Sequence, residues 1–165
     1  MNIKDNINEY FESRGPKERY TSFDYCYNYF NSFNDVGAIS EIAKPENIYF
    51  SCLQIGFFLA SWGMLRGSSF LLDKSVKHYE ELIYLISQSS GNPILNIDME
   101  KYNEDNLEIL LDYGEKIDKV LSSRDNENVT DTLKTKIILG VFGNVLALDT
   151  YNKKAYNVHS FNKKT

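Results

Sequence analysis

One arginine in this sequence lies where its charge needs a partner. Arg66 comes four residues after the only tryptophan, Trp62, and directly follows the uncharged apolar run Ile48–Leu65. An arginine in such surroundings is costly to bury unless a carboxylate or a phosphate group meets its guanidinium. Ser68 and Ser69 can add hydroxyl donors. These residues therefore form a candidate anion-binding site.

Arg66 also has a structural interpretation. Its guanidinium can pair with an internal aspartate or glutamate, or it can stack on the indole ring of Trp62. In either case the arginine would stabilise the core and bind no ligand. We favour this structural interpretation and keep anion binding as the alternative.

A second candidate surface is acidic. Glu104, Glu108 and Asp112 are spaced four residues apart, which places them on one face of a helix. Such a row is usually a solvated helix face. It can also imitate the charge of a nucleic-acid backbone toward a basic protein partner.

A third pattern interleaves rings with positive charge near the N-terminus. Aromatic side chains next to basic ones can stack on and hold single-stranded nucleic acid. The same rings more often line an interface between helices, and we favour that interpretation. The residues concerned are Tyr20, Tyr25, Tyr27, Tyr29, Arg14, Lys17 and Arg19.

Two blocks of the sequence resemble a family of small bacterial helical proteins without a settled function. They read S-W-G-M-L-R-G-S-S-F-L-L (Ser61–Leu72) and T-D-T-L-K-T-K-I-I-L-G-V-F-G (Thr130–Gly143). In that family the second block runs on into a Pro-Ala-Tyr-Asp-like tetrapeptide, where this chain has Leu146–Asp149. The resemblance implies an all-helical fold and a bacterial or phage origin, and it implies no activity.

The second block also resembles the catalytic end of helix-hairpin-helix DNA glycosylases. In those enzymes a glycine-rich hairpin precedes a helix, and an aspartate stands at the start of the next helix. The resemblance would make Gly140–Gly143 the hairpin, Asp149 the catalytic carboxylate and Lys136 a nucleophilic amine. The alternative, which we favour, is that Asp149 is an ordinary helix N-cap and Lys136 a solvated lysine.

Helical periodicity runs through most of the chain. It predicts a compact all-α bundle of about seven helices in a single domain, residues 1–165, around a central buried helix at Ile48–Leu72. We expect that central helix to end or kink between Gly63 and Ser69. Ile94–Met99 reads equally as a short strand or a surface loop. Ser160–Thr165 resembles the start of a further helix, which leaves two interpretations: a naturally short chain, or one truncated at its C-terminus.

The apolar run of the central segment is just long enough to raise the question of a membrane span. Polar residues interrupt it at Ser51, Gln54 and Ser61, and its basic flanks are sparse, with Arg66 near one edge and Lys44 alone at the other. We therefore expect a buried helix and no membrane association.

Composition narrows the classes of function. Hydrophobic residues at 42% and aromatic residues at 14% exclude a disordered chain. A formal net charge of −5 argues against broad binding of phosphate backbones. The two cysteines are too few for a disulfide framework, and the polar N-terminal segment has no signal-peptide character, so we expect a cytoplasmic protein. His78 and His159 have no second ligand at metal spacing, and we expect neither a metal nor a cofactor.

These patterns favour a non-catalytic binding module, of bacterial or phage origin, that acts on a protein or nucleic-acid partner in genome conflict. One version is an inhibitor that uses the acidic helix to occupy the basic groove of a defence nuclease. The alternative is a degenerate glycosylase-like enzyme that acts on DNA bases through Asp149.

Overall fold

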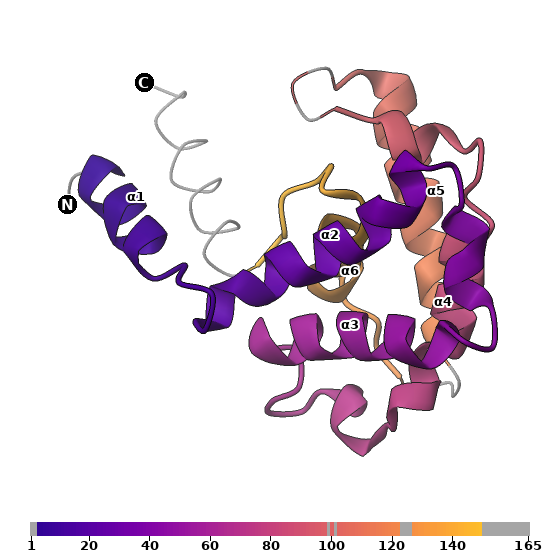
Figure 1. Cartoon of the computed structure of the whole chain (residues 1–165), viewed down its shortest axis with the longest axis horizontal. Helices are drawn as coiled ribbons and strands as arrows, with labels where there is room; N and C mark the ends of the chain where they lie inside the picture. Colours follow the sequence, from indigo (N-terminus) through magenta and orange to yellow (C-terminus); the bar gives the residue numbers. More distant parts are fainter. Residues whose placement is uncertain (1–2, 99, 101, 123–126, 150–165) are drawn as a thin grey trace.

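Six α-helices, joined by short 3-10 helices, make up most of the described chain in the computed structural model (Figure 1). The structure describes residues 3–98, 100, 102–122 and 127–149. Strands are absent from these residues, so the predicted all-α class is confirmed. The helices are α1 (Ile3–Glu12), α2 (Ser22–Asp35), α3 (Ile48–Ser61), α4 (Glu80–Ser87), α5 (Glu104–Leu121) and α6 (Asp131–Phe142).

Local side-chain chemistry decides where α5 and α6 begin and where α6 ends. The side chain of Asn103 accepts a hydrogen bond from the backbone N–H of Asn106 at 2.8 Å. The hydroxyl of Thr130 accepts one from the backbone N–H of Leu133 at 3.2 Å. Each bond satisfies a donor that the first turn leaves open. Gly143 ends α6 in the left-handed conformation at φ +68°, which glycine adopts without steric cost.

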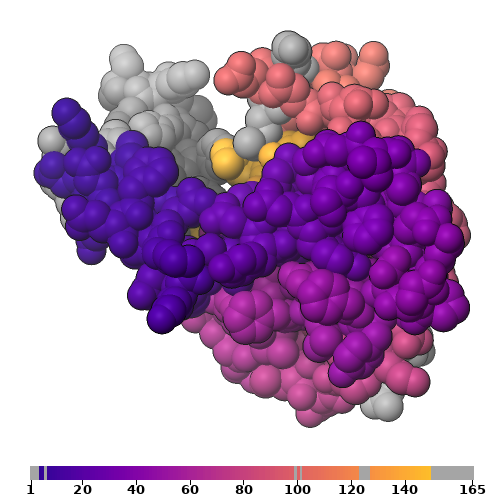
Figure 2. All heavy atoms as spheres, in the orientation of Figure 1, coloured from indigo at the N-terminus to yellow at the C-terminus, as the bar shows by residue number. Residues whose placement is uncertain are grey.

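The centre of the bundle is α6. This helix contacts α2, α3 and α5, and in Figure 1 it is seen nearly end on behind α2. Its buried residues point to several sides and include Leu133, Ile137, Ile138 and Val141. α4 packs against α3 and α5, whereas α1 extends to one side of the other helices (Figure 2).

A glycine allows α3 and α6 to approach closely. A Cβ atom added at Gly140 would lie 2.5 Å from Cε1 of Phe58 and 2.8 Å from its Cδ1. Carbon atoms that are not bonded to each other prefer about 3.5–4.0 Å. The Phe58 ring is itself fully buried, so it occupies the space that a side chain at position 140 would need.

The central apolar segment differs in detail from the expected helix Ile48–Leu72. The α-helix ends at Ser61, two residues before the predicted break begins, and Phe70–Asp73 forms a separate 3-10 helix, η3. Only one side of α3 faces the core; its outer side exposes Tyr49, Phe50, Leu53 and Phe57, the last with 64% of its surface accessible. Because the run is apolar on every side, its sequence does not indicate which face turns inward.

Two other expectations concern the later part of the chain. The segment that allowed a short strand or a loop contains a 3-10 helix, η5 (Pro93–Asn96). The helix expected after Asp149 and the motif at Ser160–Thr165 lie outside the described residues. Within the described residues, no helix has the length and apolar character needed to cross a membrane.

Candidate functional site

The C-terminal end of α3 carries the first candidate site. After Ser61 the chain turns through Gly63, whose φ is +77°. The backbone N–H of Met64 donates to the carbonyl of Leu59 at 2.8 Å, and that of Gly63 donates to Ala60 at 3.0 Å. This pair of bonds is the Schellman motif, which requires a left-handed residue at the position of Gly63.

Two cationic side chains from distant parts of the chain satisfy carbonyls that the end of α3 leaves open. Nε of Arg19, in the 3-10 helix η1 (Arg19–Thr21), donates to the carbonyl of Ser61. Nζ of Lys136, on α6, donates to the carbonyl of Trp62 at 2.6 Å. Positive charge is favourable at a helix C-terminus, where the peptide dipoles leave a partial negative charge.

The structure overturns the expectation that Lys136 is a solvated lysine. Only 6% of this residue is exposed. Burial is the main factor that lowers the pKa of its ammonium group; the charge of Asp149 acts in the opposite direction, and the charges of Arg66 and Arg19 lower it further. The apolar stem of a lysine packs like a hydrophobic side chain, and here the carbonyl of Trp62 receives its charged end.

Arg66 lies beside this pair but is exposed at the surface. Its guanidinium folds back over Gly63, where Cζ would be 3.2 Å from an added Cβ. Neither structural role expected for Arg66 occurs: among the described residues it forms no ion pair with a carboxylate and no cation–π contact with Trp62. The guanidinium is therefore available to a ligand.

Three aromatic rings of the protein pack around the indole ring of Trp62. Its ring centroid lies 5.7 Å from that of Tyr20, 6.3 Å from Phe23 and 5.6 Å from Phe58. The guanidinium of Arg19 lies 5.5 Å from the centroid of Tyr20. The indole N–H of Trp62 is buried and has no hydrogen-bond acceptor within the described chain. Of the four tyrosines in the interleaved segment, Tyr20, Tyr27 and Tyr29 are half-buried, whereas Tyr25 is 52% exposed.

Ser68 and Ser69 do not join Arg66 in one site. They line a separate pocket of about 270 Å³ with Met64, Phe70, Asn128, Thr130 and Leu133. The hydroxyl of Ser69 is also used locally, because it accepts a hydrogen bond from the backbone N–H of Leu71 at the start of η3. The predicted serine contribution to anion binding is therefore not supported by the geometry.

The acidic candidate surface lies on the outer face of α5. Glu104 and Glu108 are exposed there, and Asp112 is exposed while forming an ion pair with Lys116 at 2.7 Å. Two leucines share the outer side of this helix: Leu107 is 47% exposed and Leu111 is 72% exposed. The three acidic residues thus run along one side of an apolar strip that no other described part of the protein covers.

Asp149 follows α6, and its negative charge opposes the lowering of the pKa of Lys136, so the two residues of the glycosylase comparison interact electrostatically. The expected hairpin is different. Gly140, Val141 and Phe142 form the last turn of α6, and only Gly143 leaves the helix. The helix that we expect Asp149 to cap lies outside the described residues.

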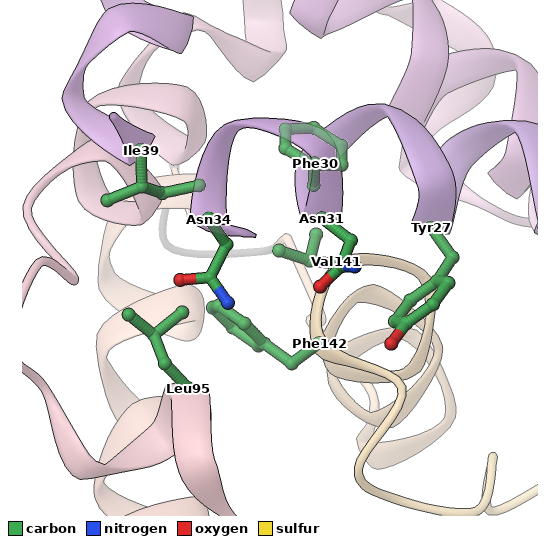
Figure 3. Close-up of a pocket in the computed structure, with 8 residues that line it drawn as sticks. All are labelled: Tyr27, Phe30, Asn31, Asn34, Ile39, Leu95, Val141 and Phe142. Atoms are coloured by element: carbon green, nitrogen blue, oxygen red, sulfur yellow. The ribbon is translucent and has the colours of Figure 1, made fainter. Parts of the chain in front are cut away.

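The remaining cavities and polar groups add little chemistry. A pocket of about 50 Å³ between α2 and α6 has room for a few water molecules, with Asn31 and Asn34 above an apolar wall (Figure 3). In the described part of the chain no three residues among His, Cys, Asp and Glu are grouped to hold a metal ion. His78 is half-buried, and burial lowers the pKa of its imidazole; His159 lies outside the described residues.

Comparisons of the chain with protein families, with curated proteins and with solved structures found no match. The resemblances to a bacterial helical family and to DNA glycosylases therefore stay predictions, and the geometry alone carries the functional argument.

Proposed function

We propose that the protein is a non-catalytic binding module that docks on a protein partner through the outer face of α5. The observation that carries this proposal is the pair Leu107 and Leu111, exposed beside the acidic row Glu104, Glu108 and Asp112. An apolar strip bordered by a row of carboxylates complements a groove with an apolar floor and a basic rim. A nuclease that holds nucleic acid in a basic groove offers such a surface, so inhibition of a defence nuclease is the favoured version.

The charge requirement is tested by the triple variant E104K/E108K/D112K. The protein serves as bait in a bacterial lysate, captured proteins are identified by mass spectrometry, and the purified partner is titrated by calorimetry. Reversal places like charges against the basic groove, and we expect the affinity to fall at least about 100-fold. An unchanged affinity would overturn the proposal.

The matched control is D5K/E9K/E12K, which makes the same change of charge on α1, where the three residues are also exposed. This variant should bind the partner as the wild type does. If both triple variants lose binding equally, the effect belongs to net charge and not to α5. The variant L107A/L111A tests the apolar strip without changing charge and should weaken binding by about tenfold or more.

A second candidate function rests on the nearness of Lys136 and Asp149. A buried amine with a lowered pKa is a better nucleophile at neutral pH than an ordinary lysine, as a glycosylase-like enzyme would require. Reduction with borohydride in the presence of DNA carrying an abasic site should then trap a covalent complex. The variant D149N should remove excision of damaged bases and leave folding nearly intact. No trapped complex with the wild type eliminates this candidate.

A further inference from the structure

Three positive charges meet at the C-terminal end of α3, and they come from three separate segments of the chain. Arg19 lies in η1, Arg66 in the loop after α3, and Lys136 in α6. The carbonyls of Ser61 and Trp62 bind the first and the last of them. This concentration of charge belongs to a chain whose formal net charge is −5, so overall composition does not account for it.

Helix capping explains only part of this charge. The end of a helix carries roughly half a negative charge, and one carboxylate, Asp149, acts on Lys136 from nearby. Together these offset roughly half of the positive charge of the three cations. The described residues therefore leave an excess of positive charge around the end of α3.

The groups without partners at this place are donors. Arg66 makes no hydrogen bond or ion pair with any described residue. The indole N–H of Trp62 is buried without an acceptor, although a buried donor of this kind usually has one. Arg19 and Lys136 each use one donor on a carbonyl and retain others. What the site lacks is an acceptor with negative charge.

We propose that the C-terminal end of α3 binds the phosphate group of a small phosphorylated molecule, with Arg66 and Arg19 at the rim and Lys136 below them. Arginine offers a planar fork of donors that matches two phosphate oxygens, and lysine adds a point charge. A small ligand fits better than a nucleic-acid strand, because a long polyanion would also meet the repulsion of an acidic protein. This site is separate from the α5 surface, so either proposal can fail without the other.

Trp62 makes the proposal directly measurable, because it is the only tryptophan in the chain. Inorganic phosphate is titrated while chloride is lowered to hold ionic strength constant, and tryptophan fluorescence is recorded. We expect a saturable change with half-saturation at or below about 1 mM. Iodide should quench the fluorescence more strongly than caesium does, because the three cations attract the anion, and phosphate should reduce the iodide effect.

The variants R66Q and K119Q provide the comparison. Both replace an exposed basic residue by the same neutral one, so neither is expected to unfold the protein. R66Q should weaken phosphate binding at least about tenfold, whereas K119Q, on α5, should leave it unchanged. The variant K136M keeps the apolar stem of the buried lysine and should also lose binding, if circular dichroism shows that it is folded.

Four outcomes would overturn the proposal. The first two are a linear fluorescence response to phosphate and equal quenching by iodide and caesium. The third is equal phosphate affinity in R66Q and the wild type. The fourth is a site that responds to a short oligothymidylate but not to inorganic phosphate. The last result would identify a single-stranded nucleic acid as the ligand in place of a small phosphorylated molecule.

Discussion

Lys136 is a buried cation whose environment opposes its charge. Burial lowers its pKa below the ordinary value of 10.5, despite the opposing effect of Asp149. Between the folded-state pKa and 10.5, the unfolded chain binds more protons at this residue than the folded chain does. The free energy of unfolding therefore rises with pH across this interval, as far as Lys136 determines it.

Replacement of Lys136 by methionine should remove this pH dependence. Urea unfolding of the wild type and of K136M at about pH 7 and about pH 9.5 measures the difference in stability at each pH. We expect the wild type to gain stability relative to K136M as the pH rises. Contributions from tyrosines are common to both proteins and cancel in this difference.

Among the elements, α3 ends in a turn that requires a left-handed backbone conformation. Gly63 has a φ of +77°, and the guanidinium of Arg66 lies against it. Gly67, in the same loop, has a φ of +61° with open space around it. A substitution at Gly67 therefore measures only the cost of a left-handed backbone. A substitution at Gly63 measures that cost together with the cost of displacing Arg66.

The variants G63A and G67A should each lose about 1–2 kcal/mol of unfolding free energy, because an L-residue pays this amount for a left-handed conformation. Only G63A should also change the fluorescence of Trp62, since only there does the new methyl group meet Arg66. Urea unfolding followed by fluorescence gives both quantities. A G63A protein as stable as the wild type would contradict the turn described for this helix.

The start of α6 illustrates what could be predicted from sequence. Thr130 directly precedes a segment with apolar residues at helical spacing, its residue type favours helix N-caps, and the structure shows its hydroxyl in that role. The glycines near the end of α3 likewise indicated a helix end close to where it occurs. Both signals are local, because the side chain or backbone conformation that stops a helix lies within a few residues of the stop.

Burial of Lys136 could not be predicted in this way. Its acceptor, the carbonyl of Trp62, is 74 residues distant in sequence, and no local pattern connects them. The exposed face of α3 could not be predicted for a different reason. Tyr49, Leu53 and Phe57 lie on that face and are as apolar as the residues that face the core. Where every side of a helix is hydrophobic, periodicity carries no information about direction.

Over the whole molecule, α2 and α3 bury the two cysteines in one hydrophobic core. Cys26 and Cys52 are free thiols with almost no exposed surface. Burial raises the pKa of both, that of Cys52 to about 11. The thiolate is the reactive form of cysteine. The folded protein therefore protects both residues in two ways: burial keeps reagents away, and the raised pKa keeps the thiols protonated.

Thiol labelling should therefore report global unfolding. With an aromatic disulfide reagent at about pH 8, we expect both cysteines of the native protein to react at least about 1,000-fold more slowly than in urea-unfolded protein, and at similar rates to each other. The single variants C26A and C52A assign the two rates. Rapid reaction of one thiol in the folded state would show that the core opens locally on that side.

The contact between Gly140 and Phe58 constrains how this sequence can change over time. The ring occupies the place of any side chain at position 140, so a larger residue there is tolerated only if position 58 becomes smaller. During divergence of the sequence, the residues at the two positions should thus be substituted together or not at all. Relatives of this protein too distant for overall similarity could be recognised by that correlated pair, one position on α3 and the other on α6.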